Sequence, residues 1–387
     1  MKKKILIGIA VIIVLAYTVI GYDFLDKLFD GDDSDKTAIN QENSDVSDKS
    51  SEDNKDDLSI VDSNSPNEEN DNLNQKDDDD ETKSDDKEVK EGIPSPLSGI
   101  YASEEKVNRR PVAIMFDNHP NARWQAGLRQ AEIVYEFRVE YPYTRYMGIF
   151  LINDPEQVGP IRSSRPYFVT ALLEYDPVYV RVGGSTAAYN YIERLNLADI
   201  DGITSGGFWR YYKTGKEIPN NMYSSMEVIR NMQKSRGFRL EGNYEGFKFY
   251  EKDTDIDGSK VEEVSINYNK DNSTRYEYDK EKKVYKRYKD GELHIDELDG
   301  LPIEAKNIII QRASTAAIDD VGRLEIDIVG EGKGYYITNG KVIDITWKKD
   351  SERSKTRYYN NSGQEIKFNS GQTWIQVTLL NTKISFN

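Results

Sequence analysis

The fold is decided by the stretch Pro-Val-Ala-Ile-Met-Phe-Asp-Asn-His-Pro, residues 111–120. Its first six residues form a short apolar run that is typical of a buried strand, and polar, turn-forming residues follow at once. Further apolar runs predict strands at 133–138, 146–152, 177–182 and 247–250. Helical spacing of apolar residues predicts helices at 165–175, 186–195 and 224–235. Alternating strands and helices indicate an α/β domain with a partly parallel sheet.

Beyond about residue 260 the composition changes. Short alternating and aromatic segments predict strands at 275–278, 284–288, 307–311, 324–329, 334–338, 341–348, 357–359 and 373–378. Turn pairs such as Asp290-Gly291 and Asn339-Gly340 separate them, which is typical of an antiparallel barrel or sandwich. The predicted class is therefore α+β and multidomain: an α/β domain at 93–260 and a mostly antiparallel β domain at 261–387.

The N-terminus predicts a membrane anchor in residues 1–29. Three lysines, at positions 2–4, precede an uncharged apolar run from Ile5 to Tyr22. A helix of about 18 residues just crosses the bilayer core, and the lysines favour the cytoplasmic side. We therefore expect one membrane pass with everything after Tyr22 outside the cell membrane. A cleaved signal peptide is the alternative interpretation.

Residues 30–92 predict a disordered acidic linker. From Asp30 to Glu91, 24 Asp and Glu residues oppose 7 Lys residues, a net charge of −17 in a chain whose total is −16. The segment holds no aromatic residue and few aliphatic ones, so it cannot bury enough apolar surface to order itself. The folded part is left nearly neutral. Its charge and the acidic linker argue against nucleic acid as a partner.

The rare residue types exclude several kinds of site. The chain has no cysteine and two histidines, His119 and His294. Disulfides, a thiol nucleophile and thiolate metal sites are therefore excluded, and a multi-histidine zinc site is disfavoured. We predict no cofactor and no metal.

Polar residues cluster where the predicted strands end, which is the usual ligand position in an open α/β sheet. The candidate ligand-binding residues are Asp117, Asn118, His119, Arg123, Arg162, Ser163, Arg165, Gly183, Gly184, Ser185 and Asn221. Arg162 and Arg165 are three residues apart and could clamp a carboxylate or phosphate. The alternative is a structural ion pair with Glu136 or Glu140.

Other interpretations remain open for the same residues. Asp117 and His119 are candidate catalytic acid–base residues, but residues of these types also form turns. Ser163 could act as a nucleophile with them, although no Gly-x-Ser-x-Gly elbow supports this. Residues 183–185, Gly-Gly-Ser, could present a helix N-terminus to an anion. The sequence favours instead a turn with Ser185 as the helix N-cap.

Several long motifs resemble the YerB-like family. They are Arg-Pro-Val-Ala-Ile-Met-Phe-Asp-Asn-His-Pro at 110–120, Val-Gly-Pro-Ile-Arg-Ser-Ser-Arg-Pro-Tyr at 158–167 and Val-Gly-Gly-Ser at 182–185. In the second half they are Ala305–Gln311, Asn339–Lys348 and Gly371–Val377. The resemblance covers about residues 94 to 380. It implies a bacterial envelope protein, mainly of Gram-positive organisms, with distinct N- and C-terminal domains and no established reaction.

Three features depart from that family. The cysteine that carries a lipid anchor in many members is absent, and a transmembrane-type segment stands in its place. Glu140-Tyr141-Pro142-Tyr143 replaces an expected Glu-Gly-Gly, and Asn220 occupies the position of an expected histidine. If that family histidine is catalytic, Asn220 leaves this chain without it, which weakens the expectation of an enzyme.

These observations predict a membrane-anchored extracytoplasmic envelope protein of unknown activity. Its α/β crevice would bind a polar or anionic ligand, such as a wall-derived glycan or peptide, or a partner protein. One alternative is a cell-wall-acting hydrolase or transferase that uses Asp117 and His119. Another is an envelope scaffold with no small ligand.

Overall fold

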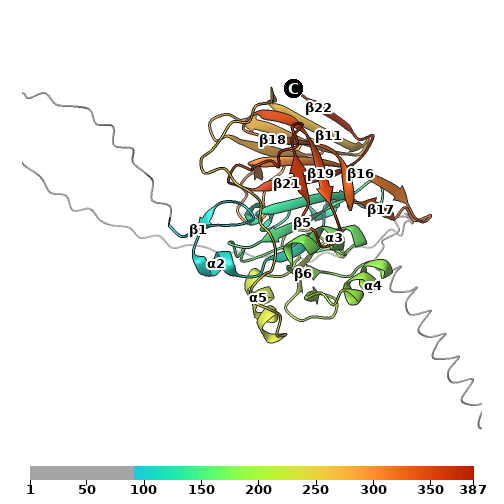
Figure 1. Ribbon diagram of the computed structural model, residues 1–387. Helices are drawn as coiled ribbons and strands as arrows, with labels where there is room; N and C mark the ends of the chain where they lie inside the picture. Colours follow the sequence, from blue (N-terminus) through green and yellow to red (C-terminus); the bar gives the residue numbers. More distant parts are fainter. Residues whose placement is uncertain (1–90) are drawn as a thin grey trace, which may run out of the picture. The chain divides into compact units, whose positions relative to one another are not determined.

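A computed structural model describes residues 91–387, which belong to one compact unit (Figure 1). The predicted membrane segment and nearly all of the predicted linker lie outside the described residues. Strands predominate over helices in the described part, and the fold is of the α+β class.

One twelve-stranded sheet runs through both halves of the sequence. Ten strands follow one another in the order β10 (Ser259–Lys260), β19 (Lys341–Lys349), β18 (Gly330–Thr338), β16 (Asn307–Ala317), β21 (Thr373–Leu379), β4 (Ile133–Arg138), β5 (Thr144–Phe150), β3 (Val112–Phe116), β6 (Val178–Arg181) and β7 (Asp199–Asp201). Two more strands pair at its side, β17 (Leu324–Asp327) with β16 and β20 (Arg357–Tyr359) with β19.

The two sequence halves meet inside this sheet. β21 pairs in parallel with β16 on one side and with β4 on the other, with Trp374 opposite Val134. The strands predicted for the C-terminal β region therefore do not pair only among themselves, because β21 continues the sheet of the first half.

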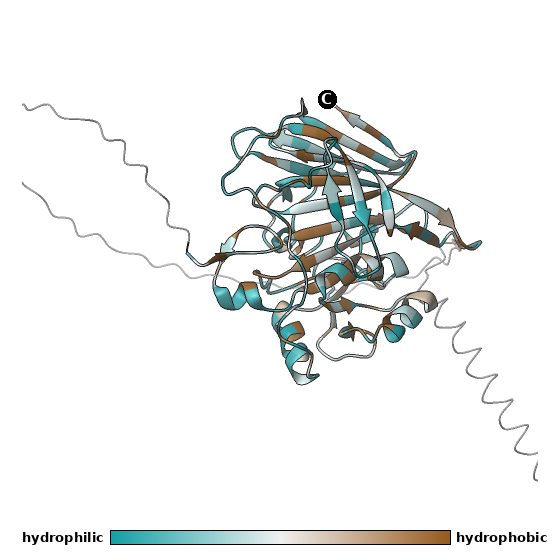
Figure 2. Cartoon of the chain, viewed as in Figure 1, coloured by the Kyte–Doolittle hydropathy of each residue, from teal (hydrophilic) through white to brown (hydrophobic). Residues whose placement is uncertain are grey.

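A smaller sheet of six strands covers part of one face. Its strands are β14 (Glu292–Leu293), β13 (Val284–Lys289), β12 (Asn272–Asp279), β11 (Glu263–Asn269) and β22 (Lys383–Phe386), with β15 (Glu304–Ala305) beside β13. Buried and more exposed residues alternate along β11, β12 and β13. Figure 2 shows the matching hydrophobic and hydrophilic bands along the strands. The inward residues, such as Val264 and Tyr276, share a core with Ile310 and Trp374 of the large sheet.

Helices cover another part of the large sheet (Figure 1). The helical segments are α2 (Glu104–Asn108), η1 (Pro120–Ala122), η2 (Leu128–Gln130), α3 (Pro166–Leu172), η3 (Leu173–Tyr175), α4 (Thr186–Arg194) and α5 (Met226–Ser235). α3 and α4 pack on the face that the small sheet leaves open, whereas α5 joins the core on the small sheet's side. Two short hairpins complete the fold, β1 (Ile93–Pro94) with β2 (Tyr101–Ala102) and β8 (Trp209–Arg210) with β9 (Met222–Tyr223).

The partly parallel sheet predicted for the first half is present. β3, β6 and β7 are parallel neighbours, while β4 and β5 run antiparallel. The strand predicted at 247–250 is wrong, since only Phe249 pairs there, in a single bridge to Phe368. The carboxyl ends of β3, β6 and β7 meet at one edge of the sheet, which we call the carboxyl edge.

Candidate functional site

An extended segment, residues 161–164, runs along the carboxyl edge and gathers several predicted residues there. The backbone N–H of Arg162 donates to Met115 O at 3.1 Å, and the N–H of Val182 donates to Arg162 O at 3.1 Å. The N–H of Ser164 donates to Gly183 O at 3.1 Å. Strands β3 and β6 are thereby bridged beyond their ends, and the turns that follow them come together.

Asp117 lies directly after β3 and is buried. Its Oδ1 accepts the backbone N–H of His119 at 3.0 Å, and its Oδ2 accepts Nδ2 of Asn220 at 2.7 Å. Nε of Arg162 is 3.3 Å from Oδ2. Burial raises the pKa of Asp117, but Arg162 and Arg145 outweigh it, and the net shift is downward. Asp117 is therefore a carboxylate whose oxygens already have donors.

His119 forms part of the turn after β3. It is the N-cap of η1, where its Nδ1 accepts the backbone N–H of Asn121 at 3.1 Å. Its ring lies 4.5 Å from the ring of Tyr143, centroid to centroid. The contact from Asp117 goes to the backbone of His119. These are the contacts of a structural turn.

Arg165 forms the structural ion pair that the sequence offered as the alternative to a clamp. Its Nε donates to Glu140 Oε1 at 2.6 Å. Arg145, at the start of β5, lies 3.7 Å from the other oxygen of Glu140 and donates to Ser163 O at 3.2 Å. Burial raises the pKa of Glu140, but Arg145 and Arg165 outweigh it and hold the pKa at about 2. Arg145 was not among the predicted site residues.

Arg162 differs from its neighbours. Its Nε is buried and has no hydrogen-bond acceptor, because the nearby Asp117 oxygen is at ion-pair distance but misaligned. The side chain keeps 16% of its surface exposed. Among residues 91–387, no hydrogen bond engages its guanidinium, and the hydroxyl of Ser163 likewise has no such partner. The end of Arg162 is thus available to a solvent-borne group.

Arg210 of β8 adds to the positive charge. Its Nη1 donates to Asn221 Oδ1 and to Pro219 O, both at 3.1 Å. Burial lowers the pKa of Arg210, and the charge of Arg162 contributes in the same direction. Asn221 itself is fully buried and holds this loop together.

The carboxyl edge as a whole carries an excess of positive charge. Its arginines are Arg145, Arg162, Arg165, Arg181 and Arg210, and its carboxylates are Asp117, Glu140, Asp199 and Asp201. Like charges that are held together favour an anion between them.

The Gly183-Gly184-Ser185 segment is a strand-to-helix turn. The Oγ of Ser185 accepts the backbone N–H of Ala188 at 3.3 Å and caps α4. Gly183 has a positive φ of 74°, and its N–H donates to Asp201 Oδ1 at 2.9 Å. The hydrogen-bonding groups described here serve the turn.

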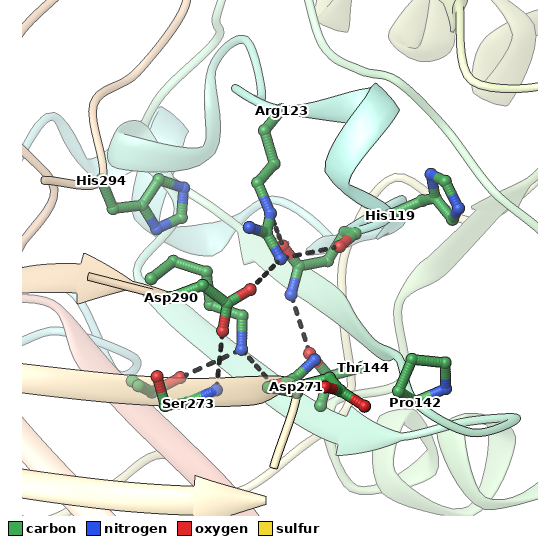
Figure 3. A network of polar contacts seen from close by, with 12 residues as sticks. His119, Arg123, Pro142, Thr144, Asp271, Ser273, Asp290 and His294 are labelled. Carbon is green, nitrogen blue, oxygen red and sulfur yellow. Dashed lines mark hydrogen bonds and ion pairs between the residues drawn. The ribbon is translucent and has the colours of Figure 1, made fainter. Parts of the chain in front are cut away.

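Arg123 extends from the turn after β3 to the second half of the chain, and Asn118 holds Arg123 in place. Asn118 Nδ2 donates to Thr144 Oγ1 at 2.7 Å, and Arg123 Nη2 donates to Asp290 Oδ2 at 2.6 Å. Figure 3 shows Arg123 directed at Asp290, with the His119 ring to one side. Arg123 therefore joins the two halves, and Asn118, whose Oδ1 accepts Arg123 Nε at 3.2 Å, supports it.

The same network continues into three charges buried between the sheets. Glu136 Oε2 accepts Arg287 Nη2 at 2.5 Å, and Glu136 Oε1 lies 3.2 Å from Lys289 Nζ. All three side chains are fully buried. Burial raises the pKa of Glu136, yet Lys289 and Arg287 hold it at about 2. These buried charges could have been predicted from the alternation of β13, which puts Arg287 and Lys289 on the same buried face as Tyr285.

A directional chain of hydrogen bonds links these charges to Asp117. Arg287 Nη1 is 2.6 Å from His294 Nδ1, and a guanidinium can only donate, so Nδ1 must accept. Nε2 of His294 then carries the proton toward Gln125 Oε1 at 2.8 Å. Gln125 Nε2 donates to Asp117 O at 2.8 Å. The second half of the chain therefore helps to position the backbone at the carboxyl edge.

Three cavities lie elsewhere on the described surface, with volumes of about 530, 420 and 330 Å³. Their linings include none of the predicted site residues. Between residues 91 and 387, no helix is both long and apolar enough to cross a bilayer. The same residues hold no cluster of His, Asp and Glu that could bind a metal ion.

Comparison with known proteins identifies the family. Residues 97–239 match the N-terminal domain model, and residues 264–375 the C-terminal domain model, of the protein of unknown function DUF3048. The chain belongs to the DUF3048 family. A Bacillus subtilis (strain 168) relative in this family, named "Putative lipoprotein YerB", is 34% identical over 291 residues, covering 73% of this chain and 85% of the relative.

A solved structure supports the fold of this family member. The crystal structure of YerB protein from Bacillus subtilis matches with a TM-score of 0.69 at 33% identity, covering 76% of this chain and 99% of that one. The resemblance to the YerB-like family that the motifs indicated is thereby confirmed.

Proposed function

We propose that this chain is an envelope protein, held at the outer face of a membrane by residues 1–29, that binds a polar anionic ligand at the carboxyl edge. The name of the Bacillus subtilis relative as a lipoprotein supports an envelope location. The apolar run from Ile5 to Tyr22 behind three lysines supports a membrane helix in place of a lipid.

The proposal that the ligand is an anion rests on Arg162. The guanidinium of Arg162 lies 3.3 Å from Asp117 Oδ2 but makes no well-aligned hydrogen bond among the described residues, so its exposed part can still donate to a ligand. A guanidinium suits carboxylates and phosphates because it donates two parallel hydrogen bonds. Arg145 and Arg210 increase the local positive charge, and the Ser163 hydroxyl offers a further contact. A wall-derived glycan or peptide with acidic groups, or an acidic partner protein, would satisfy this edge.

The ligand is tested with Arg162→Gln in the full-length protein in detergent micelles. In calorimetry with inorganic phosphate, Arg162→Gln should bind about tenfold or more weakly than wild type, because a hydrogen bond to a charged group typically contributes that much affinity. Arg194→Gln is the matched control, since Arg194 is an exposed arginine on α4 with a surface partner. Equal affinity in wild type, Arg162→Gln and Arg194→Gln would contradict the anion site and favour a scaffold.

The location is tested by surface labelling. Because the chain has no cysteine, Leu380→Cys creates a single thiol at a position that is 63% exposed. A membrane-impermeant maleimide should label this variant on intact cells. Labelling only after the cells are lysed would contradict an extracytoplasmic position.

A further inference from the structure

The carboxyl edge presents an aromatic ring that the anion site leaves unused. Tyr189, in the first turn of α4, is 37% exposed. Its hydroxyl donates to Asp201 Oδ2 at 2.9 Å, and the guanidinium carbon of Arg181 lies 4.4 Å from the ring centroid. A cation against the ring and a hydrogen bond at its rim both restrict its motion. Tyr189 is therefore a pre-ordered flat surface.

Gly183 is buried beside this ring. A β-carbon added at Gly183 would lie 3.1 Å from Ile203 Cδ1, 3.8 Å from Ser163 Cβ and 3.9 Å from Tyr189 Oη. Gly183 thus sits among these three side chains, and Ile203 is itself 44% exposed. We call this group, Ser163, Gly183, Tyr189 and Ile203, the Gly183 face.

The Gly183 face adjoins Arg162. Ser163 follows Arg162 in the chain, and the N–H of Val182 donates to the carbonyl of Arg162. Arg162 pairs with Asp117 after β3, whereas Tyr189 bonds Asp201 at the end of β7. Ser163 and Tyr189 both lie beside Gly183, so the ring and the Arg162 segment share the same part of the carboxyl edge.

We propose that the anionic ligand is a glycan unit carrying a phosphate or a carboxylate; this rests on the anion site proposed above. The apolar face of the sugar stacks on Tyr189, its acidic group pairs with Arg162, and the Ser163 hydroxyl bonds a sugar hydroxyl. A flat ring beside a hydroxyl and a guanidinium suits the C–H face, hydroxyl rim and charge of such a sugar.

Calorimetry on the full-length protein in detergent micelles tests this with four probes: inorganic phosphate, N-acetylglucosamine 1-phosphate, glucuronate and a phosphoserine peptide. Wild type should bind the sugar phosphate about tenfold more tightly than inorganic phosphate, the upper range of one aromatic contact. Tyr189→Leu should abolish that preference and leave the affinity for inorganic phosphate unchanged. Tyr189→Phe keeps the ring and should keep the preference.

The outcomes separate the two proposals. Equal affinity of wild type for the sugar phosphate and inorganic phosphate, or tighter binding of the phosphopeptide, would overturn the glycan inference. The anion site would stand in either case, provided that Arg162→Gln still binds inorganic phosphate more weakly than wild type does. Absence of all anion binding in wild type would overturn both. Tight binding of the sugar phosphate identifies phosphate as the group, and tight binding of glucuronate identifies carboxylate.

Discussion

Single residues matter most where charge is buried without water. Glu136 neutralises Arg287 and, in part, Lys289 between the two sheets, and Thr144 Oγ1 also donates to it at 2.7 Å. Removing one partner of such a group leaves uncompensated charge in an apolar interior, which costs more than the intact group contributes.

Glu136→Gln is therefore expected to lower the free energy of unfolding by about 3–5 kcal/mol. Urea unfolding followed by circular dichroism measures the change. Glu263→Gln is the control, because Glu263 pairs with Arg275 at the surface and such pairs contribute at most about 1 kcal/mol. A loss below about 1 kcal/mol in Glu136→Gln would show that the buried charges are not coupled as described.

Glu140 gives a pH-dependent effect with a defined sign. Its pKa is about 2 in the folded protein, held down against burial by Arg145 and Arg165, and about 4.3 in an unfolded chain. The stability it contributes is complete above the unfolded pKa and is lost as the pH falls toward about 2. The difference in unfolding free energy between wild type and Glu140→Gln should shrink between about pH 4.5 and pH 2. A constant difference across that range would contradict the assignment.

At the scale of elements, local capping sets where helices begin. Ser225 Oγ accepts the backbone N–H of Val228 at 3.2 Å at the start of α5, whose Met226 and Ile229 are buried in the core. Capping satisfies an N–H that the first helical turn leaves free.

Ser225→Ala is expected to cost about 1 kcal/mol, because the freed N–H loses its acceptor. Thermal unfolding of the variant measures it. Ser235→Ala serves as the comparison: its hydroxyl donates to Met232 O at the exposed end of the same helix, and little change is expected there. Equal effects at both ends would argue against the cap.

At the scale of the whole molecule, the shared sheet should make both halves unfold together. β21 is hydrogen-bonded to β16 and to β4, so neither half keeps all its sheet partners without the other. The network from Glu136 to Arg287 crosses the same boundary.

We therefore expect one cooperative transition across residues 91–387. Hydrogen exchange should give the amides of β3 and of β16 the same opening free energy, and Glu136→Gln should lower both equally. Two transitions, with β3 and β16 responding separately, would show that the halves are independent.

The sequence by itself determined the local structure of this protein and part of its edge chemistry. The apolar run before Asp117 and the capped turn at Ser185 could be predicted, since propensity, periodicity and capping depend on nearby residues. For Arg165, an ion pair with Glu136 or Glu140 was one of two open alternatives, and the structure has the pair with Glu140. Only the tertiary structure decided the pairing of β21 with β4 and the contact between Glu136 and Arg287, which are 151 residues apart. Such contacts depend on which apolar faces are buried together, and no local pattern encodes that choice. The Arg162 guanidinium, which makes an ion pair with Asp117 but no well-aligned hydrogen bond, is of this second kind, because its state depends on how the neighbouring acceptors are used.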